Sequence, residues 1–132
     1  MADPARPTGR KANPEVATVI SSRENRWLKR FRAALSGEHG DDGGIVGVEG
    51  VRLVEAALGS GLAIEALLVS ESGSRHLARV APVLASTVAV LRTSDKLFAG
   101  VADTQTPQGI AALVRPRQAA SKFWDQLQHY TT

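Results

Sequence analysis

The sequence contains no cysteine, and no apolar run approaches the roughly 20 residues that a membrane-spanning helix needs. The missing cysteines exclude disulfide bonds, thiolate metal sites and cysteine nucleophiles. They also suit a reducing compartment, so we expect a cytoplasmic protein with no membrane partner. The stretch 1–14 carries basic residues but no apolar segment, and it therefore does not predict a secretory signal.

The composition that remains is that of a globular protein. The 132 residues are 43% hydrophobic, which is enough for one domain with a core of its own. We expect a flexible basic segment over 1–18, a folded domain over 19–115, and a linker and tail over 116–132. Within the tail, the pattern predicts one short helical turn near 121–128.

Positive charge is concentrated near the N-terminus. Residues 1–35 contain eight Lys and Arg against three acidic residues, whereas the rest of the chain contains eight against ten. Such segregation favours a polyanionic partner, of which nucleic acid is the most common and an anionic membrane surface the second.

The region 23–35 is predicted to form an amphipathic helix. One stripe collects its apolar residues, which are Trp27, Leu28, Phe31, Ala34 and Leu35. The other side carries its basic residues, which are Arg23, Arg26, Lys29 and Arg30, with Arg32 at the margin. We expect Ser21 or Ser22 to cap the first turn, and Gly37 to mark the end of the helix.

From 45 to 115, strand-like and helical patterns alternate. We expect strands over 45–50, 63–70, 87–92 and 109–115. We expect helices over 51–61, 74–86 and 94–102, with Pro82 bending or dividing the second and Ser94 capping the third. The strands are almost continuously apolar, as in a sheet that is covered on both faces. The fold class is therefore α/β, a three-layer sandwich around a mostly parallel or mixed four-stranded sheet.

Spacing argues against two kinds of site. The glycines of 43–50 do not follow the pattern G-x-G-x-x-G, and they precede or interrupt a strand instead of opening a helix. We assign them to close strand packing and to a tight turn at Gly50. The three histidines are far apart in the sequence, so we expect them to be solvated or incidental and not to bind a metal ion together. They are His39, His76 and His129. With no G-x-S-x-G elbow either, the sequence predicts no catalytic and no metal-binding residue.

Glu49 ends an apolar strand at the point where a helix begins, and Arg52 follows three residues later. One interpretation is a structural ion pair or cap that fixes the junction between strand and helix. The other places Glu49 and Arg52 at a binding edge. No second carboxylate lies near them in the sequence, so a paired acid–base site is not supported.

The segment TQTPQG (104–109) places Pro107 and Gly109 where a type I turn prefers them. One interpretation is a connector into the last strand. The other is a partner-binding loop, because its polar side chains offer several hydrogen-bond donors and acceptors. These side chains are Thr104, Gln105, Thr106 and Gln108.

The basic face of 23–35 also has two interpretations. It is either a solvated surface or a surface that neutralises phosphates, whose affinity would fall steeply with salt. The segregation of charge favours phosphate contact. A membrane-surface helix is less favoured, because the stripe with Trp27 and Phe31 is needed to cover the sheet.

Four stretches occur together in the order ISSRENRWLKRFRAAL (20–35), IVGVEGVRLVEAAL (45–58), IEALLVS (64–70) and VADTQTPQGIAALV (101–114). They resemble the N-terminal substrate-binding domain of SpoU-type (TrmH-like) RNA ribose 2′-O-methyltransferases of the SPOUT superfamily. The resemblance covers about 19–115. It implies an α/β sandwich similar to ribosomal proteins that bind RNA kinks, which presents RNA, ribosomal RNA in particular, to a catalytic domain.

The resemblance also implies functional residues. The pattern S-R-x-N…K matches at Arg23, Asn25 and Lys29, and V-E-G-x-R-x-V matches around Arg52. With their neighbours on the basic face, the residues expected to bind RNA are Arg23, Asn25, Arg26, Lys29, Arg30 and Arg52. The residues that match the family's junction and its turn are Glu49, Gly50, Thr106, Pro107, Gln108 and Gly109.

The family's catalytic domain has no counterpart in this sequence. In such enzymes a knotted α/β domain follows, binds S-adenosylmethionine and carries the catalytic arginine and the dimer interface. No cofactor loop follows Pro116, so we expect RNA binding without catalysis or cofactor, and a homodimer only through the missing domain. The chain would then be a fragment, a truncated reading frame or a free-standing domain. The alternatives are a stand-alone, non-catalytic RNA-binding protein and a structural module that binds no RNA.

Overall fold

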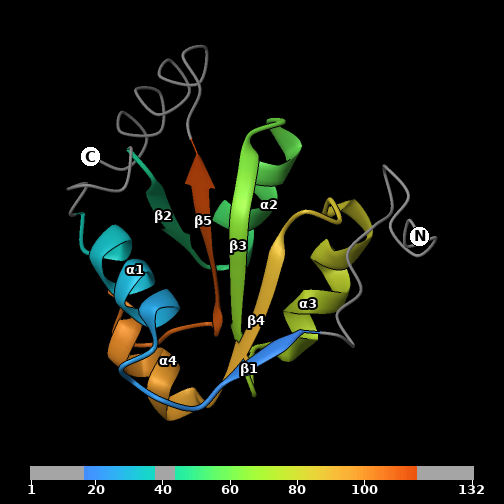
Figure 1. Cartoon of the computed structure of the whole chain (residues 1–132). Coiled ribbons are helices and arrows are strands. Elements are labelled where there is room, and N and C mark those ends of the chain that lie inside the picture. Colours follow the sequence, from blue (N-terminus) through green and yellow to red (C-terminus); the bar gives the residue numbers. More distant parts are fainter. Residues whose placement is uncertain (1–16, 38–43, 116–132) are drawn as a thin grey trace, which may run out of the picture.

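The computed structural model describes residues 17–37 and 44–115, in which strands and helices alternate along the chain (Figure 1). The strands are β1 (Thr18–Ile20), β2 (Val46–Glu49), β3 (Ala63–Ser70), β4 (Ala89–Thr93) and β5 (Ile110–Arg115). The helices are α1 (Arg26–Leu35), α2 (Val51–Gly59), α3 (Ser74–Val80), the short 3₁₀ helix η2 (Ala81–Val83) and α4 (Asp95–Val101). The predictions for 1–16, for His39 and His129, and for the tail after Arg115 lie outside the described residues.

The five strands form one mixed sheet in the order β1-β4-β3-β5-β2. β4 is parallel to both β1 and β3, whereas β5 is antiparallel to β3 and to β2. The α/β class and the mixed sheet are confirmed, but the prediction of four strands was wrong. β1 is short and mostly exposed, so it has little apolar pattern of its own. It is held at the edge of the sheet, where the Thr93 hydroxyl donates to the Ile20 carbonyl at 2.8 Å.

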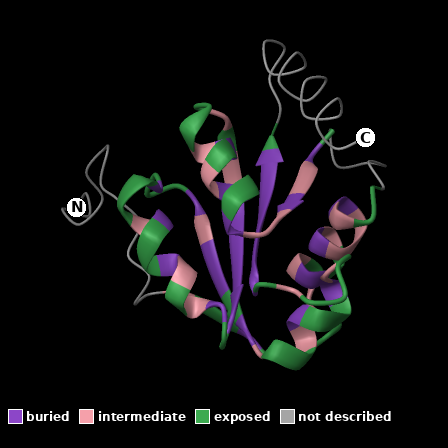
Figure 2. Cartoon of the chain, turned by 180° about the vertical axis from the view of Figure 1, so that it is seen from behind, coloured by how far each residue is buried: buried purple, intermediate pink, exposed green. Residues whose placement is uncertain are grey.

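Helices cover both faces of the sheet, and this gives the predicted three layers. α2 and α3 pack on one face and α1 and α4 on the other, each pair with its own apolar cluster. Figure 2 shows that the buried residues lie along the strands and on the inward sides of the helices. β5 is buried without a break from Ile110 to Val114. Its continuous apolar run was therefore a correct sign of a strand covered on both faces.

α1 confirms the predicted stripe but not the predicted cap. Its buried residues are Leu28, Phe31 and Ala34. The helix begins at Arg26, and its N-cap is Asn25 instead of Ser21 or Ser22. The Asn25 Oδ1 atom accepts a hydrogen bond from the Trp27 backbone N–H at 2.7 Å. This bond satisfies one of the free donors of the first turn.

The ends of the later helices follow their local sequence. α3 stops before Pro82, and η2 takes over there, so the predicted division is confirmed. Ser94 caps α4 as predicted, because its hydroxyl accepts from the Leu97 N–H at 3.1 Å. Within 17–37 and 44–115, no helix has the length and apolar character that a membrane crossing requires.

Gly47 explains how closely α1 approaches the sheet. A Cβ atom at this position would lie 2.9 Å from the backbone of Ala34 and Leu35. The interpretation of this glycine as a packing residue is therefore correct, although it contacts a helix and not a neighbouring strand. No other residue would allow this approach without moving α1.

The strands β1, β2, β3 and β4 all run in one direction, so their carboxyl ends meet at one edge of the sheet (Figure 1). We call this the carboxyl edge and define it as residues 20–25, 49–52, 70–75, 93–96 and 102–109. In open α/β sheets, ligands bind outside the carboxyl ends of the strands.

Candidate nucleic-acid interface

Helices α2, α3 and α4 begin directly at the carboxyl edge, and each has a basic residue at its second position. These residues are Arg52, Arg75 and Lys96. α1 begins after the connection 21–25 with Arg26, and Arg23 lies within that connection. All five side chains are exposed, and none of them joins an ion pair within the described part of the chain.

A basic residue in the first turn of a helix opposes the helix dipole, whose N-terminal end is positive. Each such placement costs about 0.3–1 kcal/mol on an exposed surface. The first turns of α1, α2 and α3 contain no acidic residue that would offset the charge. Helix N-termini and unpaired basic side chains at one edge together favour an anion such as phosphate.

Glu49 does not form the predicted pair with Arg52. Its Oε1 atom accepts from the Asp103 N–H at 3.0 Å, and its Oε2 atom accepts from the Thr104 hydroxyl at 2.7 Å. The carboxylate therefore holds the 102–109 loop against the end of β2. Arg52 is left exposed, with its charge available to a ligand.

Asp95 is bound in a similar way at the start of α4. Its Oδ1 atom accepts from the backbone N–H of Ser72 at 2.9 Å and from the Ser72 hydroxyl at 2.8 Å. These hydrogen bonds, the backbone one first, hold the pKa of Asp95 below its ordinary value. The exposed acidic residues of the same edge are Glu24, Glu71, Asp95 and Asp103. The edge thus mixes free basic groups with carboxylates that are partly engaged in holding loops.

Gln108 joins the TPQG segment to the start of α2. Its Oε1 atom accepts from the Val51 N–H at 2.8 Å and supplies the side-chain cap that Gly50 lacks. Gly50 has a φ of 98°, as the predicted tight turn requires, and its N–H donates to the Ile110 carbonyl at 2.9 Å. The two sequence motifs around Gly50 and Gln108 are therefore parts of one structural junction.

Gly109 and Gly73 pack backbone against backbone in the centre of the carboxyl edge. A Cβ atom on Gly73 would collide with the Gly109 carbonyl, and one on Gly109 would meet the Ser70 hydroxyl. The Gly109 carbonyl accepts from the Ser70 N–H at 2.9 Å, and the Ser70 hydroxyl accepts from the Gly73 N–H at 3.0 Å. This packing fixes the 70–75 and 102–109 loops relative to each other.

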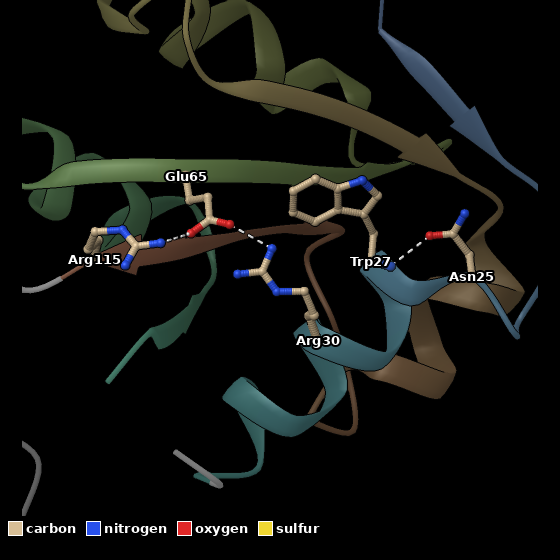
Figure 3. A network of polar contacts seen from close by, with 5 residues as sticks. All are labelled: Asn25, Trp27, Arg30, Glu65 and Arg115. Atoms are coloured by element: carbon tan, nitrogen blue, oxygen red, sulfur yellow. Dashed lines mark hydrogen bonds and ion pairs between the residues drawn. The ribbon is translucent and has the colours of Figure 1, made fainter. Parts of the chain in front are cut away.

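Arg30 takes part in a network away from the carboxyl edge (Figure 3). Its Nη1 atom lies 2.6 Å from Glu65 Oε2, and Arg115 Nη2 lies 2.6 Å from Glu65 Oε1. The hydrogen bond from Arg30 contributes most to a lowered pKa of Glu65, against partial burial, which raises it. The Arg30 guanidinium also lies over the Trp27 ring, 5.0 Å from its centroid. Arg30 is therefore not a free cation like Arg52.

The pairing of β3 explains why Glu65 faces α1. The register between β3 and β5 shifts between Ile64 and Ala66, which leaves Glu65 as the extra residue of a β-bulge. Ile64 packs with the α2 and α3 cluster, whereas Ala66 packs with the α1 and α4 cluster. The bulge thus turns Glu65 toward Arg30, and a bulge that redirects one side chain is a common device in sheets.

The residues predicted to bind RNA are placed in different roles. Arg23, Arg26 and Arg52 are exposed without an ion pair among the described residues. Asn25 uses its side-chain oxygen as the N-cap of α1. Lys29 lies 3.5 Å from Glu24, an exposed pair of little strength.

The residues predicted at the turn are also placed. Thr106 is exposed and Pro107 partly exposed, and residues 103–106 and Gly109 form bends. The type I turn predicted there lacks its closing hydrogen bond, because the Gly109 N–H does not donate to the Thr106 carbonyl. Sequence reasoning missed Arg75 and Lys96. The signal that could have found them was a basic residue directly after each predicted start of a helix.

His76 differs from its prediction as a solvated residue. Its Nε2 atom is buried without a hydrogen-bond partner. Burial, followed by the nearby charges of Arg75 and Arg79, lowers the pKa of this imidazole. In the part of the chain that the structure describes, no three His, Cys, Asp or Glu side chains gather as a metal site.

Comparison with known families gives one match. The family described as the MRM3-like substrate binding domain matches residues 38–112. No curated protein sequence matches the chain significantly.

Two crystal structures show the same fold. One is an RNA 2′-O ribose methyltransferase, with a TM-score of 0.63 and 28% identity over 76% of this chain and 39% of that chain. The other is an rRNA methyltransferase from Sinorhizobium meliloti, with a TM-score of 0.59 and 23% identity over 76% of this chain and 38% of that chain. The present chain therefore spans about two fifths of the length of either structure.

Proposed function

Because the chain belongs to the family of MRM3-like substrate-binding domains, we propose that it binds the RNA substrate of a SpoU-type methyltransferase. The substrate would be ribosomal RNA and the modified group a ribose 2′-hydroxyl, as the names of the two similar structures suggest. A separate catalytic domain would bind S-adenosylmethionine and transfer the methyl group. The present residues would supply affinity and placement.

The observation that carries this proposal is the unpaired positive charge of the carboxyl edge. Arg52 and Arg75 occupy first-turn positions without an acidic neighbour in the same turn, and these positions cost stability unless an anion is bound there. Lys96 is also exposed and unpaired at this edge but shares the first turn of α4 with Asp95. The phosphates of RNA are such anions, and basic side chains at a phosphate fix the position of the RNA without reading its sequence.

The loops of the edge suit a fixed docking surface. Glu49 and Gln108 hold the 102–109 loop, and the packing of Gly73 on Gly109 holds the loop beside it. The exposed residues Ser72 and Thr106 add hydroxyls to the 70–75 and 102–109 loops, and the Ser72 hydroxyl already donates to Asp95. Hydroxyls can donate to or accept from a ribose 2′-hydroxyl, which distinguishes RNA from DNA.

We also propose a cytoplasmic location, which the cysteine-free composition supports. A homodimer would be formed through the catalytic domain and not through the residues described here.

The test compares two variants that each lose two positive charges. R52A/R75A removes unpaired residues of the carboxyl edge, whereas R79A/R115A removes residues that are paired with Glu55 and Glu65. Binding of a labelled RNA stem-loop is measured between about 50 and 200 mM salt, and the slope of log affinity against log salt is determined.

We expect R52A/R75A to lower affinity at every salt concentration and to reduce the salt slope by about 2, one for each lost phosphate contact. R79A/R115A should leave the slope nearly unchanged. Equal losses in the two variants would mean that only net charge matters, and the carboxyl edge would then not be the interface. No binding by the unmodified chain at low salt would end the RNA proposal for these residues.

A further inference from the structure

Trp27 and Arg30 form a pair that the carboxyl edge does not use. They lie one turn apart on α1, and the Arg30 guanidinium is 5.0 Å from the centre of the indole ring. Glu65 holds this guanidinium at 2.6 Å, and Arg115 binds the other oxygen of the same carboxylate (Figure 3). The pair is thus fixed before any ligand arrives, so little side-chain entropy is left to lose on binding.

The pair stands at the margin of the helical layer. Trp27 packs against the apolar cluster of α1 and α4 but stays partly exposed, and the Arg30 side chain is 25% exposed. A flat ligand can therefore contact only the exposed parts of these two side chains, at the outer margin of α1.

Resting on the proposed function, we infer that Trp27 and Arg30 form a stacking site for an unpaired nucleobase of the RNA. Unpaired bases stack on aromatic rings and on guanidinium planes. The Arg30 guanidinium lies over the Trp27 ring, so a base would stack on the outer plane of this guanidinium, which the indole supports from behind. Arg26 is one turn before Arg30 on the same flank of α1 and is exposed, so it can bind the phosphate beside the stacked base. The ligand class is therefore single-stranded or looped RNA and not a continuous duplex.

The chain offers a direct optical test. Its two tryptophans are Trp27 and Trp124, so W124F leaves Trp27 as the single tryptophan. The probes are a short single-stranded RNA and the same strand annealed to its complement. We expect the single strand to quench Trp27 emission on binding, whereas the duplex binds without quenching.

Matched variants separate stacking from folding. W27L should weaken binding of the single strand about tenfold and leave duplex affinity nearly unchanged, whereas W27F should recover most of the loss. R30K keeps the positive charge but removes the planar guanidinium, so it should also lower the affinity for the single strand and leave the affinity for the duplex nearly unchanged. L35A shortens another partly buried residue of the same helix and cluster, and it should change neither affinity. Circular dichroism confirms that each variant is folded.

The outcomes distinguish this inference from the proposed function. Binding of both RNAs with neither quenching nor a selective loss in W27L overturns the stacking site and leaves the proposed function intact. Binding of neither RNA overturns the proposed function and the stacking site with it. Equal losses for single strand and duplex in W27L would show a structural role of Trp27, and this also overturns the inference.

Discussion

The two ends of the sheet treat positive charge differently. At the carboxyl edge, Arg52 is exposed and has no ion pair among the described residues. Toward the other end, Arg79 lies 3.0 Å from Glu55, and Arg115 lies 2.6 Å from Glu65. A count of basic residues would not separate these regions. The lack of an ion-pair partner, and not the mere presence of a cation, is therefore what distinguishes the surface that we propose as the site for an anion.

The polarity of the helices sharpens the same contrast. Arg79 lies in the last turn of α3, where the negative end of the dipole favours a cation. Arg75 lies in the first turn of the same helix, where the dipole opposes it. One helix therefore carries a stabilising and a destabilising arginine within one turn of each other, and only the destabilising one faces the proposed ligand.

The largest expected loss of stability comes from disrupting the packing of Gly73 against Gly109 at the carboxyl edge. G73A places a Cβ atom against the Gly109 carbonyl, where backbone on both sides prevents relief. We expect a loss of about 3 kcal/mol in the free energy of unfolding, measured by urea denaturation. G59A is the control, because its Cβ would meet open space at the end of α2, and it should change stability by less than about 1 kcal/mol. Similar stability of both variants would contradict the close packing.

A smaller loss of stability is expected from removing the Gln108 side chain, which holds the 102–109 loop to the start of α2. Q108A removes the cap on the Val51 N–H and should lower the free energy of unfolding by about 1 kcal/mol. Gln105 is exposed in the same loop and forms no hydrogen bond or ion pair with the described residues, so Q105A should change the free energy of unfolding by less than about 0.5 kcal/mol. If Q105A and Q108A unfold at the same urea concentration, the 102–109 loop does not depend on this cap.

The smallest expected loss of stability comes from removing the charge of Glu65, away from the carboxyl edge, and this loss depends on pH. The Arg30 hydrogen bond lowers the pKa of Glu65 in the folded state below its ordinary value, so the pair stabilises the fold fully at pH values above that ordinary pKa. The contribution disappears as the pH falls through the lowered pKa. E65Q should therefore be less stable by about 1 kcal/mol at neutral pH and equal to the unmodified chain in acid. E55Q breaks a more exposed pair and should show a smaller difference, so a larger one would reverse the expected order.

Much of the fold could be predicted because its signals are local. The stripe of α1, the division of α3 at Pro82 and the cap at Ser94 depend on residues within one or two turns. β1 escaped prediction because its three residues gain their structure from β4, more than seventy residues away in the sequence. The cap of α1 was misplaced because three polar residues, Ser21, Ser22 and Asn25, compete for the role, and the path of the chain from β1 decides among them.

The hydrogen-bond and ion-pair partners of the candidate site residues could not be predicted from the sequence. Glu49 and Arg52 are close enough to pair, but the loop 102–109 offers Glu49 a backbone N–H and a hydroxyl that the sheet brings beside it. The sequence pattern places Arg30 on the basic face of α1, but it does not show that the β-bulge directs the carboxylate of Glu65 toward Arg30. Each of these partners lies at least thirty-five residues away in the sequence, and only the strand order brings it close.

The single reversed strand also sets the route by which the chain leaves the domain. β5 starts at the carboxyl edge and runs against its neighbours, so Arg115 emerges at the far end of the sheet. Six residues of strand separate that exit from the edge by roughly 20 Å. Anything tethered after Arg115 would therefore have to reach back along the length of the sheet, or wait for RNA to extend toward it, to meet a ligand held at the carboxyl edge. The direction of one strand thus sets the chain's exit about one strand length away from the proposed binding surface.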